Sequence, residues 1–333
     1  MRPPGPGGGA AARPVPWPTG GSPGASACAA GGPDALNRTV AAYKAAATIT
    51  RGLPGPLASL LGRGGALGAS ALLDDERLII ERNLRRVYGP DYSGLPLRRS
   101  VQAVLDNYAR YWVESFRLPG TSSEELDAGM SFDGFHRIEN AVDSGIGPIL
   151  ALPHLGAWEW GGFWLASTWK HEVTVVVEGL EPPELFEWFA ALRRSFGMTV
   201  VPLGPGAGAT VVTAIKQAHV TCLLSDRDIN GSGVEVEFFG ERTTLPGGPA
   251  TLALRTGAAL LPAAVYYRGK GHHATIREAV PAERRGRLRD DVQRVTQVLA
   301  YELEALIRAE PEQWHLLQPN WPSDHEALAA ARA

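Results

Sequence analysis

Residues 147–162 read GPILALPHLGAWEWGG. An apolar run bounded by Gly147 and Pro153 is typical of a strand that is buried on both faces. His154 follows at once, and Gly156 favours a turn before the aromatic residues of a helix that we predict over 157–168. The stretch therefore predicts a strand, a loop and a helix, with an imidazole just after the strand and a carboxylate, Glu159, in the first helical turn.

Apolar runs and helical patterns continue to alternate on the C-terminal side of this stretch. Further apolar runs are VTVVV (173–177), MTVVPL (198–203), HVTCLLS (219–225) and ALLPAAVYY (259–267). Helical patterns lie between and after them, at about 182–196, 208–217, 248–258 and 287–309. Strands that alternate with helices indicate an α/β fold, with a single mostly parallel central sheet flanked by helices.

The chain before this region predicts N-terminal helices. Capping residues and periodic apolar positions indicate one helix from about residue 74, stopped by Gly89-Pro90, and a longer one over 96–117. Residues 36–72 favour broken helices, which either pack on the domain or lie on a membrane surface. We divide the chain into a disordered low-complexity tail (1–35), one domain (36–322, helical over 36–120 and α/β over 131–322) and a second tail (323–333).

Composition excludes several classes of function. A net charge of -3 gives no general field for nucleic acid. The two cysteines, Cys28 and Cys222, do not form a disulfide framework and favour a reducing compartment. The chain has no apolar run of about 18 residues, the length expected of a membrane span, and its start lacks the apolar core of a signal peptide. No P-loop, dinucleotide motif, GxSxG elbow or metal-ligand spacing occurs.

Ionisable residues follow three of the predicted strands directly. His154 comes after the first, Glu178 after the second, and Asp226, Arg227 and Asp228 after the fourth. Because ligands bind at the carboxyl ends of strands in open α/β sheets, we expect these residues to meet at one site.

The partner of His154 is open among three carboxylates. On a continuous helix, five residues turn about 500°, so His154 and Glu159 meet only if the histidine lies in the loop. Asp226 or Asp228, from another strand, offers the alternative. A histidine held by a carboxylate is a general base, and without a protein nucleophile it favours direct transfer to a substrate hydroxyl.

PHLGAWE is an H-x4-E motif, and with it the sequence resembles the glycerolipid-type acyltransferases. Within them it is similar to the branch of bacterial lipid A acyltransferases and phosphatidylinositol mannoside acyltransferases, and more so to the latter. The resemblance spans about residues 75–322. It rests on ERNLRRVYG (81–89), NYARYWVESFRLP (107–119), the 151–162 stretch, the block from Ser225 to Leu260 and PEQWHLLQPNW (311–321).

The resemblance implies roles for individual residues. His154 is the expected base, Glu159 the motif acid and Asp226 the support of the histidine, although Asp228 lies two residues away. Residues expected to contact the acceptor are Glu178, Arg194, Arg227, Asp228 and Arg242. Trp158 and Phe163 are either core residues or walls of a tunnel for an acyl chain.

The expected reaction moves a long, palmitoyl-like chain from acyl-CoA to a mannose hydroxyl of a phosphatidylinositol mannoside, with neither a cofactor nor a metal. Alternatives are another glycolipid acceptor such as lipid A with an acyl carrier protein donor, a thioesterase-like hydrolase, and a lipid-binding protein without catalysis. We expect a peripheral protein on the cytoplasmic face of the cell membrane. The candidates for a basic face toward anionic lipid are Arg82, Arg85, Arg86, Arg98, Arg99, Arg193 and Arg194, but the sequence alone favours an ordinary solvated helix face for them.

Overall fold

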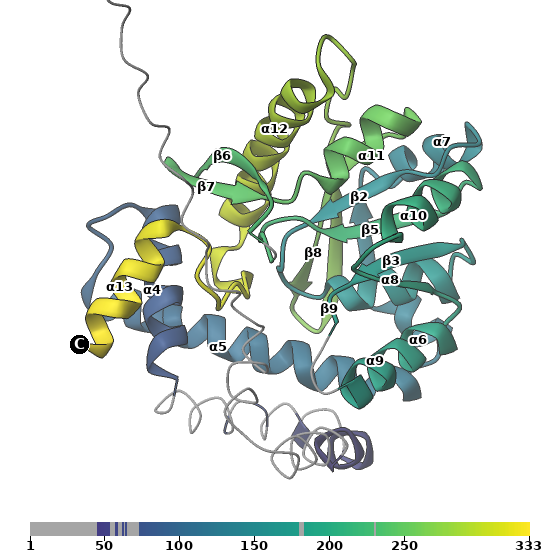
Figure 1. The fold of residues 1–333 in the computed structure, drawn as a ribbon. Helices are drawn as coiled ribbons and strands as arrows, with labels where there is room; N and C mark the ends of the chain where they lie inside the picture. The colour runs from purple at the N-terminus through teal and green to yellow at the C-terminus, as the bar shows by residue number, and fades with distance from the viewer. Residues whose placement is uncertain are drawn as a thin grey trace, which may run out of the picture.

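A computed structural model describes residues 45–53, 57–58, 62, 64, 73–179, 183–229 and 231–333 (Figure 1). The predicted tail over 1–35 and most of the 36–72 segment lie outside these residues. Residues 45–52 are helical, as expected of that segment. In this helix Ala47 is buried against Phe116 and Phe189, whereas Ile49 is exposed.

The two predicted N-terminal helices are α4 (Asp74–Tyr88) and α5 (Gly94–Arg117). The apolar face predicted for the longer one is confirmed, since Val101, Val104, Leu105 and Phe116 are buried. We expected residues 323–333 to form a tail, but Pro322–Arg332 is helix α13, which packs on α4. The fully buried carboxylate of Asp324 holds it there, through ion pairs with two arginines of α4.

The central sheet has seven strands in the order β1-β9-β8-β2-β5-β3-β4. All neighbouring pairs are parallel except β8 and β9. The predicted α/β class with a mostly parallel sheet is therefore confirmed. The strands are β1 (Met130–Asp133), β2 (Ile149–Leu152), β3 (Val173–Val177), β4 (Thr199–Pro202), β5 (Val220–Leu224), β8 (Leu260–Arg268) and β9 (Gly271–Ile276).

Helices cover the sheet on both sides (Figure 1). The helices that lie after β2 in the chain and before the C-terminal segment are α8 (Trp158–Ser167), α9 (Pro183–Ser195), α10 (Ala207–Lys216), α11 (Gly248–Thr256) and α12 (Leu288–Ala309). The short helices α6 (Ser123–Ala128) and α7 (His136–Asp143) precede β2, and β6 (Val234–Phe238) pairs with β7 (Glu241–Leu245) as a separate hairpin. The helices predicted between the strands are thus all present.

Strand β2 separates two hydrophobic cores. Ile149 and Ala151 lie in the core shared with α10, α11 and α12. Leu150 and Leu152 lie in the other core, which α7 and α8 complete. Because successive side chains of a strand point to opposite faces, a strand placed between two helical layers has to be apolar throughout. This is the reason for the uninterrupted ILAL run.

Candidate active site

Strand register brings His154 and Asp226 together. Leu152 of β2 pairs with Leu224 of β5, and each of the two ionisable residues comes two positions later. The side chains meet at the carboxyl edge of the sheet, where His154 Nδ1 lies 2.6 Å from Asp226 Oδ1. The backbone N–H of His154 also donates to Asp226 Oδ2, at 3.0 Å. The imidazole is thereby fixed at two points.

Asp226 is the carboxylate that holds the histidine. It is fully buried, and Trp314 Nε1 donates to its Oδ2 at 2.9 Å. Burial on its own raises the pKa of this carboxyl, but the charge of His154 and the donated hydrogen bonds outweigh it and lower the pKa below its ordinary value. An ionised Asp226 keeps the proton on Nδ1 of His154, so the lone pair of Nε2 is free to accept a proton.

Asp228 has a structural task in the loop that follows. Its Oδ2 accepts from the backbone N–H of Gly233 at 2.7 Å and from Thr244 Oγ1 at 2.8 Å. These bonds tie the loop after β5 to the β6–β7 hairpin. Of the two aspartates that the sequence left open as partners, the structure therefore pairs Asp226 with His154.

The segment 313–320, which precedes α13, holds the backbone around the dyad in place. The N–H of His315 donates to the carbonyl of His154 at 2.7 Å, and that of Gly156 to the carbonyl of Gln313 at 2.9 Å. The amide of Asn320 donates to the backbone carbonyl of Asp226, at 3.0 Å. Sequence reasoning did not assign roles to Trp314, His315 or Asn320; their place in the closing stretch that supports the family resemblance was the available signal.

Glu159 lies in the first turn of α8, as predicted, but its carboxylate does not meet the imidazole. In the described chain it forms an ion pair with Arg193 of α9, in which Arg193 Nε lies 3.3 Å from Glu159 Oε2. Burial lowers the pKa of Arg193, yet Glu159 more than offsets this and the net shift is upward. The pair joins α8 to α9 beside the site, and the Glu159 carboxylate is directed to Arg193 and not to the His154 ring.

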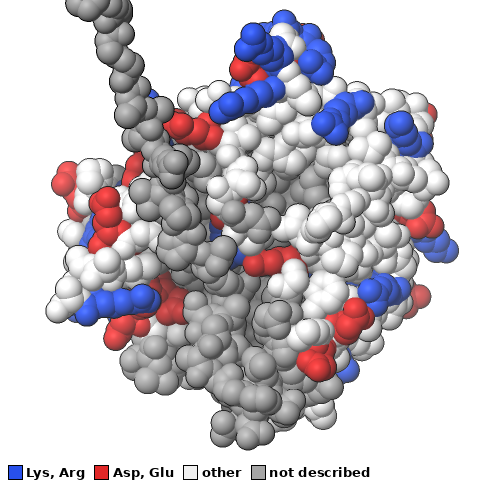
Figure 2. All heavy atoms as spheres, in the orientation of Figure 1, with Lys and Arg blue, Asp and Glu red and all other residues white. Residues whose placement is uncertain are grey.

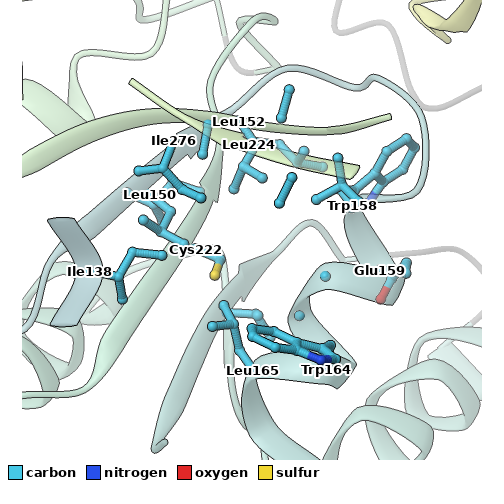
Figure 3. Close-up of a pocket in the computed structure, with 18 of the residues that line it drawn as sticks. Ile138, Leu150, Leu152, Trp158, Glu159, Trp164, Leu165, Cys222, Leu224 and Ile276 are labelled. Atoms are coloured by element: carbon cyan, nitrogen blue, oxygen red, sulfur yellow. The ribbon is translucent and has the colours of Figure 1, made fainter. Parts of the chain in front are cut away.

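An apolar cavity opens beside the dyad, between one face of the sheet and α7, α8 and α9. Its empty space, which includes open solvent at the mouth, is about 840 Å³. Figure 3 shows Trp158 and Glu159 at one end, and Ile138 and Leu150 toward the other. Apolar residues of six strands line it, at positions such as Phe132, Leu152, Val175, Cys222, Val265 and Ala274.

Two glycines of α8 let this helix lie close to β8 and to Met198. A Cβ atom on Gly161 would lie 2.7 Å from Val265 Cγ2, and one on Gly162 would lie 3.2 Å from Met198 Cε. Gly156, before the helix, has a φ of +62°, and a Cβ there would meet the carbonyl oxygen of Val265. The glycines of the opening stretch thus let the backbone pass close to β8.

The two aromatic candidates have different positions. Trp158 lines the cavity, stacks on Tyr111 at 4.2 Å between ring centroids, and contacts the His154 ring at 5.7 Å. Phe163 is buried in the core, where its ring packs against Phe196 at 4.3 Å. Phe163 is therefore a core residue, whereas Trp158 lies at the site.

Arg227 and Glu178 pair at the carboxyl ends of β5 and β3, with Arg227 Nη2 2.7 Å from Glu178 Oε2. Glu178 also borders a polar cleft with Gly179, Leu203 and Ile229. These two candidates therefore lie at the predicted edge of the sheet.

Arg194 and Arg242 are both exposed, and each pairs with a nearby carboxylate. Arg194 lies 3.2 Å from Glu187 on α9, and Arg242 lies 3.5 Å from Glu235 on the hairpin. The contacts of the described residues do not link either arginine to the dyad.

The predicted basic face does not form as a unit. Arg86 and Arg82 bind Asp324, and Arg193 binds Glu159, so these three cations serve ion pairs within the protein. Arg98 and Arg99 are exposed on α5. In Figure 2 the densest basic group lies at the top, where Figure 1 places the segment that leads into α12. The exposed cations there are Arg284, Arg285 and Arg287 before α12, and Arg289 in its first turn.

Two general properties of the described residues bear on the site. None of their helices combines the length and the apolar character that crossing a bilayer takes. Their His, Cys, Asp and Glu side chains do not form a group of three or more arranged to hold a metal ion.

Comparison with known proteins places the chain in a family. Residues 35–323 match the family described as bacterial lipid A biosynthesis acyltransferase. A phosphatidylinositol mannoside acyltransferase of Mycolicibacterium smegmatis is 35% identical over 285 residues, which cover 85% of this chain and 91% of that protein. One of Mycobacterium tuberculosis is 37% identical over 251 residues, 74% of this chain and 77% of its own. The chain therefore belongs to the bacterial lipid A biosynthesis acyltransferase family.

Proposed function

We propose that the chain transfers a long, palmitoyl-like acyl group from acyl-CoA to a mannose hydroxyl of a phosphatidylinositol mannoside. The observation that carries this proposal is the junction of a carboxylate-held histidine with an apolar cavity. Direct acyl transfer needs a base beside a long apolar slot, and Trp158, which lines the cavity, contacts the ring of His154. The names of the similar mycobacterial proteins support the choice of acceptor.

In the proposed mechanism His154 acts as general base. Its Nε2 takes the proton of the mannose hydroxyl while the oxygen attacks the thioester carbon. Asp226, ionised and buried, stabilises the imidazolium that forms. When the tetrahedral intermediate collapses, the carbon–sulfur bond breaks and the leaving thiolate takes the proton from Nε2. The acyl group passes directly to the acceptor, without a covalent bond to the protein.

The cavity is the proposed place of the acyl chain. Burial of each methylene in an apolar site contributes about 0.8 kcal/mol, so a long chain binds more strongly than a short one. Figure 3 shows the lining from Trp158 to Ile138, along which the chain would extend under the sheet. The carbonyl would then lie at the Trp158 end, next to the imidazole.

The acceptor is proposed to approach from the edge that carries Glu178 and Arg227. Their ion pair and the neighbouring polar cleft offer hydrogen-bond partners to a sugar headgroup. Since this acceptor is a lipid of the cell membrane, we propose that the protein works at the cytoplasmic surface of that membrane as a peripheral protein. The exposed arginines before α12 are candidates for contact with anionic headgroups.

The proposal is tested with purified protein and palmitoyl-CoA, in the presence and absence of phosphatidylinositol mannosides. Thiol release and the mass of the lipid are followed together. We expect acceptor-dependent release and the mass gain of one palmitoyl group, both lost in His154→Ala. The matched control is His273→Ala, because His273 is a half-buried histidine that binds Ser131 on the β1–β9 edge. Equal release without the acceptor would identify a hydrolase instead, and release only from an acyl carrier protein thioester would overturn the choice of donor.

A further inference from the structure

Phe132 borders the apolar cavity and also reaches solvent. It lies on the edge strand β1, and its side chain is 44% exposed. The other described residues that line the cavity are buried or half-buried. A single exposed aromatic side chain is ordinary on a protein surface. Phe132 differs because its ring is also a wall of an internal apolar space, and therefore separates that space from water.

Three aromatic rings close the cavity at this edge of the sheet. The ring centroid of Phe132 lies 4.7 Å from that of Phe135 and 5.5 Å from that of Trp164. The rings of Phe135 and Trp164 are 5.2 Å apart, and both side chains are buried. Phe135 lies at the start of α7 and Trp164 on α8, where Figure 3 shows it across the cavity from Leu152 and Leu224. We call Phe132, Phe135 and Trp164 the aromatic plug, of which Phe132 is the outer member.

The aromatic plug lies about one acyl chain away from the dyad. Phe132 pairs with Ala274 of β9, and Ala274 pairs with Val265 of β8. Val265 in turn forms a β-bridge with Gly156, in the loop that carries His154. Phe132 and this loop are therefore level along the sheet and three strand spacings apart, which is about 14 Å. The hydrocarbon of one membrane leaflet, filled by one layer of lipid chains, is about 15 Å thick. A chain whose carbonyl lies at the dyad would thus end at the plug.

We propose that Phe132 sets the longest acyl chain that the protein accepts, because its ring covers the methyl end of the bound chain. This inference rests on the proposed acyl transfer and adds the residue that determines which donors are used. Each methylene that enters the cavity strengthens binding about fourfold. A chain that is longer than the distance to the plug has to displace the Phe132 ring or fold back, so its additional methylenes no longer strengthen binding.

Ile138 of α7 is the other residue that could limit the chain, and the structure distinguishes the two. Ile138 lies one turn after Phe135, lines the same end of the cavity and is 2% exposed. Its side chain belongs to the core that α7 and α8 share with the sheet. Shortening Ile138 therefore adds only a small enclosed space, whereas shortening Phe132 opens the cavity to solvent. The first change would move the limit by one or two carbons, and the second would remove it.

The first test measures binding without turnover. S-alkyl-CoA thioethers with chains of twelve to twenty-two carbons, which lack the reactive carbonyl, are titrated into each protein by calorimetry. In wild type we expect Kd to fall about fourfold per methylene up to a limiting length and to rise beyond it. In Phe132→Ala the rise should disappear, so that all longer chains bind as tightly as the longest one that wild type accepts. Phe132→Trp, which enlarges the plug, should move the limit to shorter chains.

Tyr301→Ala is the matched control, because Tyr301 is 50% exposed on α12 and does not line the cavity. Its length profile should equal that of wild type. The inference is overturned if folded Phe132→Ala and Phe132→Trp both keep the wild-type limit. It is also overturned if Ile138→Ala alone shifts the limit, since the chain then ends inside the core and not at the edge of the sheet.

The second test uses the acyl-transfer assay with palmitoyl-CoA and with a donor two carbons longer than the limit found for wild type. The ratio of kcat/KM for the longer donor to that for palmitoyl-CoA should rise about tenfold or more in Phe132→Ala. An unchanged ratio contradicts the inference. Because thioether binding needs neither the base nor the acceptor, the two proposals fail separately. A length limit that depends on Phe132 without any transfer refutes the proposed function alone, and transfer with an unaltered limit refutes this inference alone.

Discussion

Replacing Asp226 with asparagine should change the protonated nitrogen of His154 while leaving the shape of the site intact. The carboxylate accepts at both oxygens: Oδ1 faces His154 Nδ1 at 2.6 Å, and Oδ2 accepts from the His154 backbone at 3.0 Å and from Trp314 at 2.9 Å. Asparagine has a single oxygen. Placed where it satisfies the two fixed donors, it leaves the NH2 group facing Nδ1. That nitrogen must then present its lone pair, so the proton moves to Nε2 and the base is lost.

The magnitude follows from this change of tautomer. In a comparable aspartate–histidine pair, the same substitution lowers kcat about 10⁴-fold with its geometry preserved. We expect a fall of about 10³–10⁴-fold in Asp226→Asn, which corresponds to about 4–5.5 kcal/mol of transition-state stabilisation. Two of the three hydrogen bonds survive, so the free energy of unfolding should fall by about 1–3 kcal/mol, the cost of one disturbed buried bond.

Two measurements decide the matter. Initial rates of thiol release at saturating donor and acceptor give kcat, and ¹⁵N chemical shifts of the His154 ring report which nitrogen is protonated. Asp228→Asn is the matched control, because it lies in the same loop but binds Gly233 and Thr244. The reasoning is refuted if Asp226→Asn retains kcat within tenfold of wild type, or if Nδ1 remains protonated in a variant that has lost activity.

Three further results are expected. Asp324→Ala should lower the free energy of unfolding by about 3–5 kcal/mol in urea titrations, since it leaves two arginines of α4 without their buried partner; a loss below 1 kcal/mol would show that α13 contributes little. Burial alone raises the pKa of Glu114, but its hydrogen bond with His272 and the charges of His272 and Arg110 outweigh burial, so the net shift is downward. The stability that this carboxylate contributes is present above its pKa in the unfolded chain and is lost as the pH falls through its lower pKa in the folded protein. The unfolding midpoint of Glu114→Gln should therefore depend less on pH in the acid range than that of wild type, and parallel curves for the two proteins would contradict this assignment. Burial raises the pKa of the Cys222 thiol to about 12, so it should resist iodoacetate at neutral pH until urea unfolds the chain, and rapid labelling of the folded protein would show that the cavity admits charged molecules.

Four of the five apolar runs predicted as strands lie inside the sheet, whereas the fifth, β4, is an edge strand of mixed burial. β2, β3, β5 and β8 lie inside the sheet, where the absence of polar positions makes an apolar run visible. β1 was missed because it is a four-residue edge strand whose last three residues are exposed. The antiparallel β9 alternates in burial, with His272 buried and His273 half-buried, as expected of adjacent strand residues, although the strand itself was not predicted.

The site was predictable as far as strand ends reveal it. His154 and the Asp226–Asp228 pair follow apolar runs, but a loop lets either aspartate face the histidine, and strand register with the bonds of Asp228 decides between them. The Trp314 contact joins residues 88 positions apart, and local periodicity holds no information on such a distance. Glu159 was located correctly on its helix, but its partner Arg193 belongs to the next helix along the chain.

The hydrogen bond from Trp314 to Asp226 has a consequence for the order in which the protein becomes active during synthesis. A nascent chain that has emerged through residue 312 possesses the base, its carboxylate and the apolar cavity. It lacks the Trp314 indole that donates to this carboxylate, the His315 N–H that donates to the carbonyl of His154, and the Asn320 amide that donates to the carbonyl of Asp226. We expect such a chain on the ribosome to leave acyl thioesters intact. Activity would begin when the segment 313–321 docks. The histidine would therefore become reactive only at a late step of folding, and an incomplete chain would not consume the acyl thioester.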